Sequence, residues 1–107
     1  MNVGQYIIII VNLGPTFGSK INKTRLYVVI SPKERNHNLK TVVITPITAT
    51  KKDYPTRIKV ANNNVNGRIA LDQIRTIDRQ RNLKIIGMLA SIEVVKVKKI
   101  MDETYVR

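Results

Sequence analysis

The sequence predicts a mainly β fold, a small barrel closed on one side by a C-terminal helix. Short runs rich in β-branched and aromatic residues recur with turn-forming residues between them, which is typical of a small barrel or sandwich. The last segment carries apolar residues at helical spacing. No internal repeat or linker divides the 107 residues, so we expect one domain, 1–107. The expected strands are 6–11, 25–31, 40–44, 57–60 and 68–71.

The first expected strand contains five consecutive apolar residues, 7–11. A membrane-spanning helix needs about 20 such residues. The segment also lacks the basic region and the small-residue cleavage site of a signal peptide. We therefore expect a buried strand and no membrane partner.

Two polar stretches are expected to connect strands. Residues 32–38, "PKERNHN", are interpreted as a polar connector. Asn66-Gly67 lies in an asparagine-rich stretch and is a dipeptide that favours a tight turn.

The C-terminal segment 91–106 has two possible interpretations. Residues 95–98 alternate between apolar and basic, as in a strand, but the length of the segment favours a helix. Ser91 is a suitable N-cap, with Glu93 in the first turn. One helical face would carry Val94, Val97, Met101 and Tyr105.

The chain is strongly basic, with 19 Lys and Arg against seven Asp and Glu and a net charge of +12. Such an excess indicates a polyanionic or acidic partner, most often nucleic acid, although a merely basic protein is the alternative. The chain has no cysteine, which excludes disulfides and thiolate chemistry and agrees with a cytoplasmic location.

Residues 13–20, "LGPTFGSK", resemble a phosphate-binding loop but do not have the spacing of a P-loop. Only three residues separate Gly14 from Gly18, and Ser19 precedes Lys20 instead of following it. A strand is expected next, so no helix N-terminus is available to hold a phosphate. With Lys23 and Arg25 nearby, the loop can still attract an anion of another kind.

Several kinds of catalytic site are poorly supported by the residues. His37 is the only histidine and lies in a polar connector, so neither a metal site nor a Ser-His-Asp triad is expected. The seven acidic residues are scattered, which disfavours paired-carboxylate glycoside chemistry. Cleavage of RNA without a metal or other cofactor remains, because RNA carries its own nucleophile, the 2′-OH.

Two residues could support such a cleavage. Arg25 stands where a loop becomes a strand, and a guanidinium can pair with two phosphate oxygens. Thr48 follows another expected strand and could donate a hydroxyl to the phosphate. Their structural alternatives are a surface ion pair for Arg25 and a turn cap for Thr48.

Three ordered blocks resemble the MazF/PemK (Kid) toxin family. They are "NLGPTFGS", "KTR" and "VIS" between 12 and 31, "VVITPITA" with "YPT" between 42 and 56, and "LDQIRTID" at 71–78. The resemblance runs from about residue 4 into the C-terminal segment. It implies an SH3-like barrel with a C-terminal helix, a homodimer, and a toxin of a type II toxin–antitoxin system.

The resemblance also implies an activity and two partners. The activity is ribosome-independent cleavage of single-stranded RNA at short sequences, leaving a 2′,3′-cyclic phosphate and a 5′-OH without a metal. The partners are single-stranded RNA and an acidic, MazE-like antitoxin that occupies the RNA groove. The net charge of +12 suits either polyanion.

Three positions match the catalytic residues of the family. Arg25 matches its catalytic arginine, Thr48 its active-site threonine, and Asp72 a position that acts as base in some members. A structural pairing of Asp72 with Arg75 or Arg79 is the alternative.

RNA contacts are expected from two segments, 17–23 and 50–54. The chain has no tryptophan and few other aromatic residues, so we expect recognition by hydrogen bonds and shape more than by stacking. The candidate RNA-binding residues are Phe17, Ser19, Lys20, Lys23, Thr50 and Tyr54.

The sequence departs from the family pattern at several positions. Lys20 stands where a glutamate is usual, which removes a candidate base and adds positive charge beside Arg25. Val3-Gly4-Gln5 stands where the family usually has Arg-Gly-Asp or Arg-Gly-Glu, and Leu26 and Ala70 also differ from the pattern. These departures leave open a slow enzyme or a degenerate member that only binds RNA or antitoxin. A gyrase poison of the CcdB type is disfavoured, because those toxins use a C-terminal tryptophan region that this chain lacks.

Overall fold

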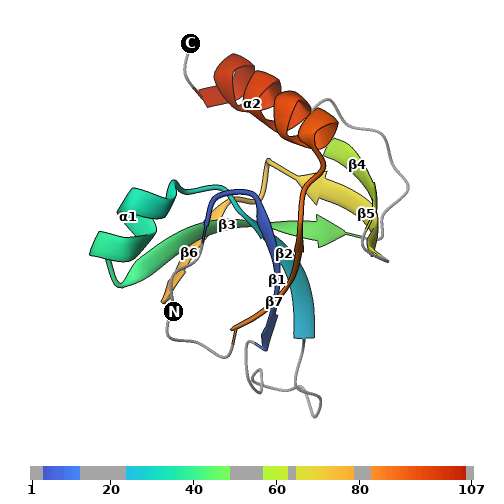
Figure 1. Cartoon of the computed structure of the whole chain (residues 1–107). Helices are drawn as coiled ribbons and strands as arrows, with labels where there is room; N and C mark the ends of the chain where they lie inside the picture. Colours follow the sequence, from blue (N-terminus) through green and yellow to red (C-terminus); the bar gives the residue numbers. More distant parts are fainter. Residues whose placement is uncertain (1–3, 13–23, 49–56, 63–64, 79–82, 106–107) are drawn as a thin grey trace.

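The structure, a computed structural model, describes residues 4–12, 24–48, 57–62, 65–78 and 83–105 (Figure 1). Its elements in chain order are β1 (Ile7–Asn12), β2 (Thr24–Val29), α1 (Lys33–Asn38), β3 (Thr41–Thr48), β4 (Arg57–Asn62), β5 (Val65–Ala70), β6 (Arg75–Asp78), β7 (Leu83–Met88) and α2 (Ser91–Tyr105).

The strands form one antiparallel sheet in the order β4-β5-β3-β2-β1-β7, with β6 paired to β3 outside this path. The sheet curls into a half-barrel, and α2 lies at the top of the half-barrel in the view of Figure 1, next to β4. The expected fold class, a small β-barrel with a C-terminal helix, is therefore confirmed.

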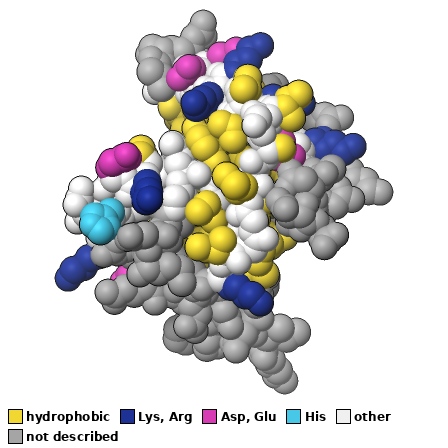
Figure 2. All heavy atoms as spheres, viewed as in Figure 1, with side chains coloured by type: hydrophobic (Ala, Val, Ile, Leu, Met, Phe, Trp, Pro, Cys, Tyr) yellow, Lys and Arg dark blue, Asp and Glu magenta, His cyan; other side chains and the backbone are white. Residues whose placement is uncertain are grey.

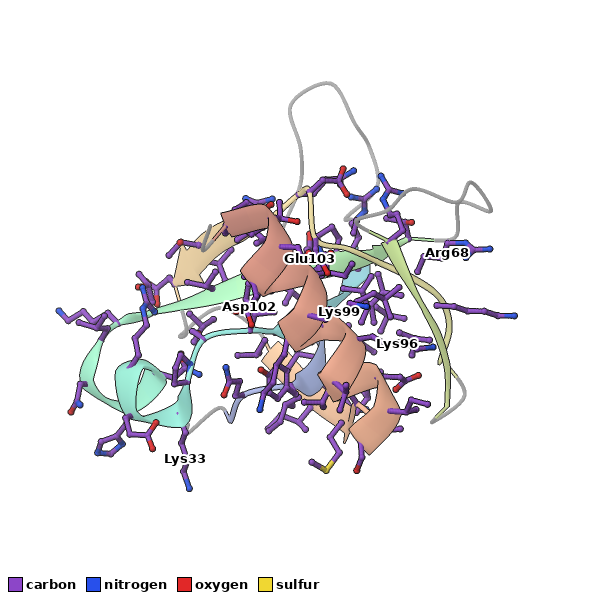
Figure 3. The ribbon with its side chains drawn as sticks, turned by 90° about the horizontal axis from the view of Figure 1, so that it is seen from above. Lys33, Arg68, Lys96, Lys99, Asp102 and Glu103 are labelled. Atoms are coloured by element: carbon purple, nitrogen blue, oxygen red, sulfur yellow. The ribbon has the colours of Figure 1, made fainter. Side chains whose placement is uncertain are left out.

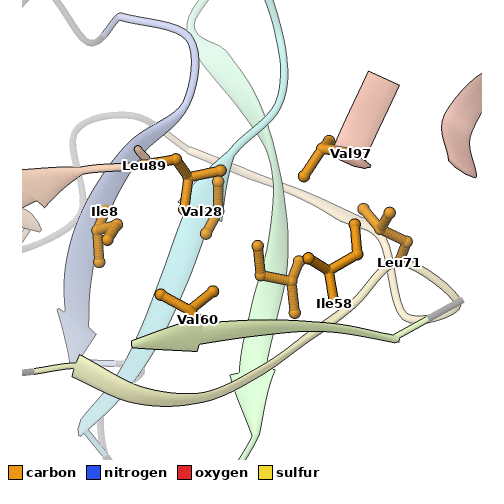
Figure 4. Packing of buried hydrophobic residues seen from close by; sticks show 8 residues of the cluster. Ile8, Val28, Ile58, Val60, Leu71, Leu89 and Val97 are labelled. Atoms are coloured by element: carbon orange, nitrogen blue, oxygen red, sulfur yellow. The ribbon is translucent and has the colours of Figure 1, made fainter. Parts of the chain in front are cut away.

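The main core lies between the curled sheet and α2 (Figure 4). Val97 of α2 is buried against it, with Val94, Ile100 and Met101 packed around. The expected helical face therefore meets the core, because its apolar residues recur three or four positions apart. The buried members are Ile8, Val28, Ile58, Val60, Ile69, Leu71, Leu89 and Val97.

A second apolar cluster uses the alternate positions of the same strands. Ile8 belongs to the first cluster and Ile9 to the second; Val28 and Val29 divide in the same way. Because successive strand residues point to opposite faces, β1 and β2 are buried on both sides. This explains why β1 is a continuous apolar run without alternation. The second cluster is Ile9, Val11, Tyr27, Val29, Val42, Ile44 and Ile77.

Tyr6 fixes the chain where β1 begins. Its φ is 65°, a left-handed value that is rare outside glycine. Its N–H donates to Val29 O at 2.6 Å, and its carbonyl accepts from the Leu89 N–H at 2.9 Å. Burial, followed by the negative charge of Asp102, raises the pKa of the Tyr6 phenol.

The expectation of a polar connector at 32–38 is wrong, because this segment contains the helix α1. Its buried residue Asn36 donates to Ser31 O at 2.9 Å and accepts from the Ser31 hydroxyl. The same hydroxyl accepts from the Val43 N–H at 3.0 Å. Side-chain hydrogen bonds to β3 therefore hold a short helix that has no apolar periodicity.

The tight turn expected at Asn66-Gly67 is also wrong, because both residues lie inside β5. Gly67 is needed there for another reason: a Cβ would lie 2.6 Å from Thr48 O and 2.8 Å from Ile47 Cγ2.

Two strands were not expected, β6 and β7. In β6 only Ile77 is buried, so the apolar signal is weak.

The C-terminal helix is confirmed, but its expected cap is not. The first helical hydrogen bond runs from the Val94 N–H to Ala90 O, so Ala90 holds the cap position. The buried Glu93 carboxylate accepts from the Ala90 N–H at 2.8 Å, which is half of a capping box.

No helix in the described part of the chain is long and apolar enough to cross a membrane.

The close approach of β5 to β3 gives a first prediction. Gly67→Ala must push the Thr48 backbone away and should lower the free energy of unfolding by about 1–3 kcal/mol, measured by urea denaturation. Gly4→Ala is the control, because its Cβ would meet only the flexible end of Ile7, at 3.2 Å. Equal stability of the two variants would contradict this account of Gly67.

Candidate active site

The candidate site forms at the end of β3, where Thr48 is the last residue of the strand. The pairing of β3 with β5 places Thr48 directly opposite Arg68. Gly67, next to Arg68, allows the two backbones to approach at this point. The position of Thr48 is therefore set by main-chain packing.

Arg57, the first residue of β4, joins Thr48 to Asp72. Its Nε donates to Asp72 Oδ1 at 3.1 Å and its Nη2 to Asp72 Oδ2 at 3.4 Å. Its Nη1 lies 3.5 Å from Thr48 Oγ1. The Arg57 side chain is only 8% exposed, whereas that of Asp72 is 42% exposed. A well-packed guanidinium thus holds an accessible carboxylate and the hydroxyl of the half-buried Thr48 together.

The segment that carries Asp72 is a turn inserted between β5 and β6. Both strands pair with β3, and the Gln73 N–H donates to Ala70 O at 3.0 Å in the turn. Ala70 is paired with Arg57, so Asp72 emerges beside that guanidinium.

Two hydrogen bonds hold the start of this turn, one from β3 and one from α2. The buried Thr45 hydroxyl of β3 donates to Ala70 O. The Tyr105 hydroxyl of α2 donates to Leu71 O at 2.5 Å, and the Leu71 side chain is fully buried. The sheet and the C-terminal helix therefore both determine where Asp72 lies.

Arg25 lies on the neighbouring strand at the same end of the β2–β3 pair. The last pair of that ladder is Tyr27 with Pro46. Arg25 is two residues beyond this pair on β2, and Thr48 is two residues beyond it on β3. The Arg25 side chain is exposed, so its guanidinium is accessible to a ligand at this end of the sheet.

The structure corrects one expectation about these residues. The partner of Asp72 that it shows is Arg57, not Arg75, which lies on β6. Arg79 lies outside the described residues. The expected RNA-binding residues Phe17, Ser19, Lys20, Lys23, Thr50 and Tyr54 also lie outside them.

Sequence reasoning gave Arg57 no role. A signal was present, because residues 57–60 alternate basic and apolar, which places Arg57 and Lys59 on the face away from the core. The pairing with Asp72 could not be seen, because it depends on the register of β4 with β5.

The arrangement can bind and orient a phosphate. A threonine hydroxyl has one proton to donate and two lone pairs. Because Arg57 donates to Thr48 Oγ1, the Thr48 proton is available to donate to a phosphate oxygen. Among the described residues, no three His, Asp or Glu side chains gather as a metal-binding group.

Residues 5–104 match the model of one protein family, the PemK-like, MazF-like toxins of type II toxin–antitoxin systems. The chain belongs to this family. The family resemblance of the three sequence blocks is thereby confirmed. None of the curated proteins matches the chain in sequence.

Solved structures of MazF toxins have the same fold. MazF in a MazE–MazF crystal (Form-III) from Deinococcus radiodurans superposes with a TM-score of 0.84 at 20% identity, covering 96% of this chain and 95% of that one. MazF (Form-I) from the same organism has a TM-score of 0.81 at 20% identity, covering 100% and 99%. An endoribonuclease in complex with its cognate antitoxin from a mycobacterial species has a TM-score of 0.80 at 17% identity, covering 94% and 92%.

The ion pair of Arg57 with Asp72 is tested by a double-mutant cycle. Arg57→Ala should lower the free energy of unfolding by about 1–3 kcal/mol, because the hydrogen bonds to a charged partner are lost. In a protein that already carries Asp72→Ala, Arg57→Ala should lower the free energy of unfolding by about 1 kcal/mol less than it does in the wild type, measured by urea denaturation. The matched cycle of Arg75→Ala with Asp72→Ala should give no coupling. Coupling in the Arg75 cycle alone would show that the pairing is assigned to the wrong arginine.

Proposed function

We propose that this protein is an endoribonuclease toxin, a single domain over 1–107 that cleaves single-stranded RNA independently of the ribosome and at short specific sequences. The observation that carries the proposal is the meeting of Thr48, Arg57 and Asp72 at the end of β3, with Arg25 at the same end of the β2–β3 pair. Membership of the MazF-like toxin family and a net charge of +12 support it.

The proposed reaction uses the 2′-OH of the RNA as nucleophile. The 2′-oxygen forms a bond to the neighbouring phosphorus while the bond from phosphorus to the 5′-oxygen breaks. A base takes the proton of the 2′-OH, and the departing 5′-oxygen gains a proton. The products are a 2′,3′-cyclic phosphate and a 5′-OH.

Each proposed catalytic residue has one task. Arg25 pairs with the non-bridging oxygens of the phosphorane, where negative charge accumulates. The Thr48 hydroxyl donates to one of these oxygens and orients the phosphate. Asp72 is the candidate base, although both of its oxygens accept from Arg57, so it would act while held in one orientation.

No cofactor is needed in this proposal. The nucleophile belongs to the substrate, and the charge is balanced by arginine, so we expect cleavage without a divalent cation. A reducing cytoplasm is the proposed location, because RNA is available there and a chain without cysteine has no disulfide that reducing conditions could break.

An acidic antitoxin is the second proposed partner. Two of the similar structures are toxins solved with an antitoxin, MazE in one of them. An acidic segment lying over the candidate site would meet the same cations as RNA and would block access to Thr48. We therefore propose that antitoxin and RNA compete.

A homodimer is proposed on a separate face. Met88, Ile92 and Val95 are 62%, 66% and 64% exposed, and Ile85 is 42% exposed. Figure 2 shows hydrophobic side chains gathered in a band over β7 and the beginning of α2. A band of this kind is typical of an interface between protein chains. A second copy would bury it and would add stability to a small chain.

The dimer is tested by placing charge in the band. Ile92→Asp should shift the protein to monomer, measured by sedimentation equilibrium, because an unpaired carboxylate would be buried at the interface. Leu39→Asp is the control, since Leu39 is also exposed but follows α1. A wild-type protein that is monomeric at high concentration would refute this proposal directly.

The activity is tested by incubating a long unstructured RNA with the protein in EDTA. Discrete fragments with cyclic phosphate ends are expected from the wild type. Arg25→Ala should cut about 10²–10³ times more slowly, because the charge of the phosphorane is no longer stabilised. Lys33→Ala, which removes an exposed charge on α1, should cut at the normal rate.

Two outcomes would go against the enzyme. Loss of cutting in EDTA that Mg²⁺ restores would overturn the metal-free route. RNA that is bound but not cut would favour the degenerate binding protein, and Lys20→Glu would then be made. New activity in Lys20→Glu would show that the natural residue at 20 removed it.

A further inference from the structure

A basic groove lies between the β4–β5 pair and α2. Within the described part of the chain, its cavity of about 420 Å³ is lined by five cationic side chains, one carboxylate and two isoleucines. The basic groove is defined by Arg57, Ile58, Lys59, Arg68, Lys96, Lys99, Ile100 and Glu103. Figure 3 shows Lys96 and Lys99 on α2 and Arg68 on the strand side.

Two of the cations in this groove face each other directly. Lys59 on β4 is paired with Arg68 on β5. Directly opposite like charges destabilise an antiparallel pair. Lys96 and Lys99 add two further positive charges from one side of α2, since residues three apart on a helix are neighbours. The basic groove thus gathers positive charge from both the sheet and α2.

The basic groove is continuous with the candidate active site. Arg68 is paired with Thr48 on one side and with Lys59 on the other, so the three residues form a row across β3, β5 and β4. Neighbouring strands lie about 4.8 Å apart, so this row spans roughly 10 Å. Arg57 lines the groove and also contacts Thr48 and Asp72.

We propose that the basic groove binds the phosphates of RNA that flanks the cleavage site, leading the strand from Thr48 toward α2. This inference rests on the proposed ribonuclease function and extends it beyond the short recognised sequence. Lysine binds phosphate as a point charge and reads no base. Among the residues that the structure describes, none of those lining the groove is an aromatic on which a base could stack. It therefore adds affinity that is independent of sequence and falls with salt.

Glu103 sets a boundary to this surface. Its carboxylate lines the basic groove and would repel a phosphate that came close to it. Removing this charge should extend the favourable surface.

The test measures binding of labelled RNA with 2′-O-methyl riboses, which cannot be cut because the nucleophile is blocked. Two lengths are used, a 15-mer and a 5-mer, with fluorescence anisotropy at several salt concentrations. The groove variant is the triple change Lys59→Gln, Lys96→Gln and Lys99→Gln. The control variant, Lys33→Gln, Lys40→Gln and Lys84→Gln, removes the same charge from other exposed positions.

The groove variant should bind the 15-mer about tenfold more weakly than the wild type, with a salt slope smaller by about 2. It should bind the 5-mer and cut a short substrate as the wild type does. The control variant should change binding of the 15-mer by less than about twofold, and Glu103→Gln should tighten it. Circular dichroism verifies that each variant is folded.

Equal losses in the groove and control variants would overturn the proposal, because net charge alone would then explain the binding. A groove variant that loses as much affinity for the 5-mer as for the 15-mer would also overturn the proposal. A groove variant that keeps its RNA affinity but loses affinity for an Asp- and Glu-rich peptide would assign the surface to an acidic protein segment instead. If the wild type cuts no RNA, the proposed function fails, while the groove is still judged by the binding ratio.

Discussion

The arrangement of the molecule depends on β3 being paired along both of its edges. One edge pairs with β2, and the other pairs first with β6 and then, at Ile47 and Thr48, with β5. Pairing with β2 extends to Pro46, and the last two residues of the strand, Ile47 and Thr48, are held by β5, so main-chain pairing makes the end of β3 a platform for the site. The side chains of the candidate site come from three other elements that all meet there: β2, β4 and the turn after β5.

On this platform, the pairing of Arg57 with Asp72 both satisfies a buried charge and orients the groups of the candidate site. A guanidinium that is only 8% exposed has lost most of its water, so it needs partners with good geometry. Asp72 supplies two oxygens to it and Thr48 a third, so the same guanidinium orients the carboxylate and the hydroxyl. The net stabilisation is small, but the orientation is well defined.

Much of the fold could be predicted from the sequence, because its strands and final helix have strong patterns. Val97 and its neighbours on α2 show the helical spacing that packing requires, and β1 is apolar throughout. The helix α1 could not be predicted, since the buried amide of Asn36 holds it through contacts that are distant in sequence. Gly67 was interpreted as a turn residue, because a close approach to another strand leaves no local signal.

The candidate site could be predicted only in part, for a similar reason. Family blocks pointed to Arg25, Thr48 and Asp72, and the structure joins two of them through a hydrogen-bonded neighbour. That neighbour, Arg57, becomes visible only once β4 and β5 are paired in register. Catalytic roles for all of these residues stay predictions.

The two-sided burial of β1 also affects how the chain folds. A slip of one residue usually exchanges apolar for polar side chains, and this cost keeps a strand in place. In β1 a slip mostly exchanges isoleucine for isoleucine, because residues 7–10 are identical. Correct alignment must then come from fixed points, the left-handed Tyr6 and the bulge between Ile8 and Ile9 against β7. A chain that lost them would have competing strand alignments of similar energy, and it would fold slowly or into a mixture.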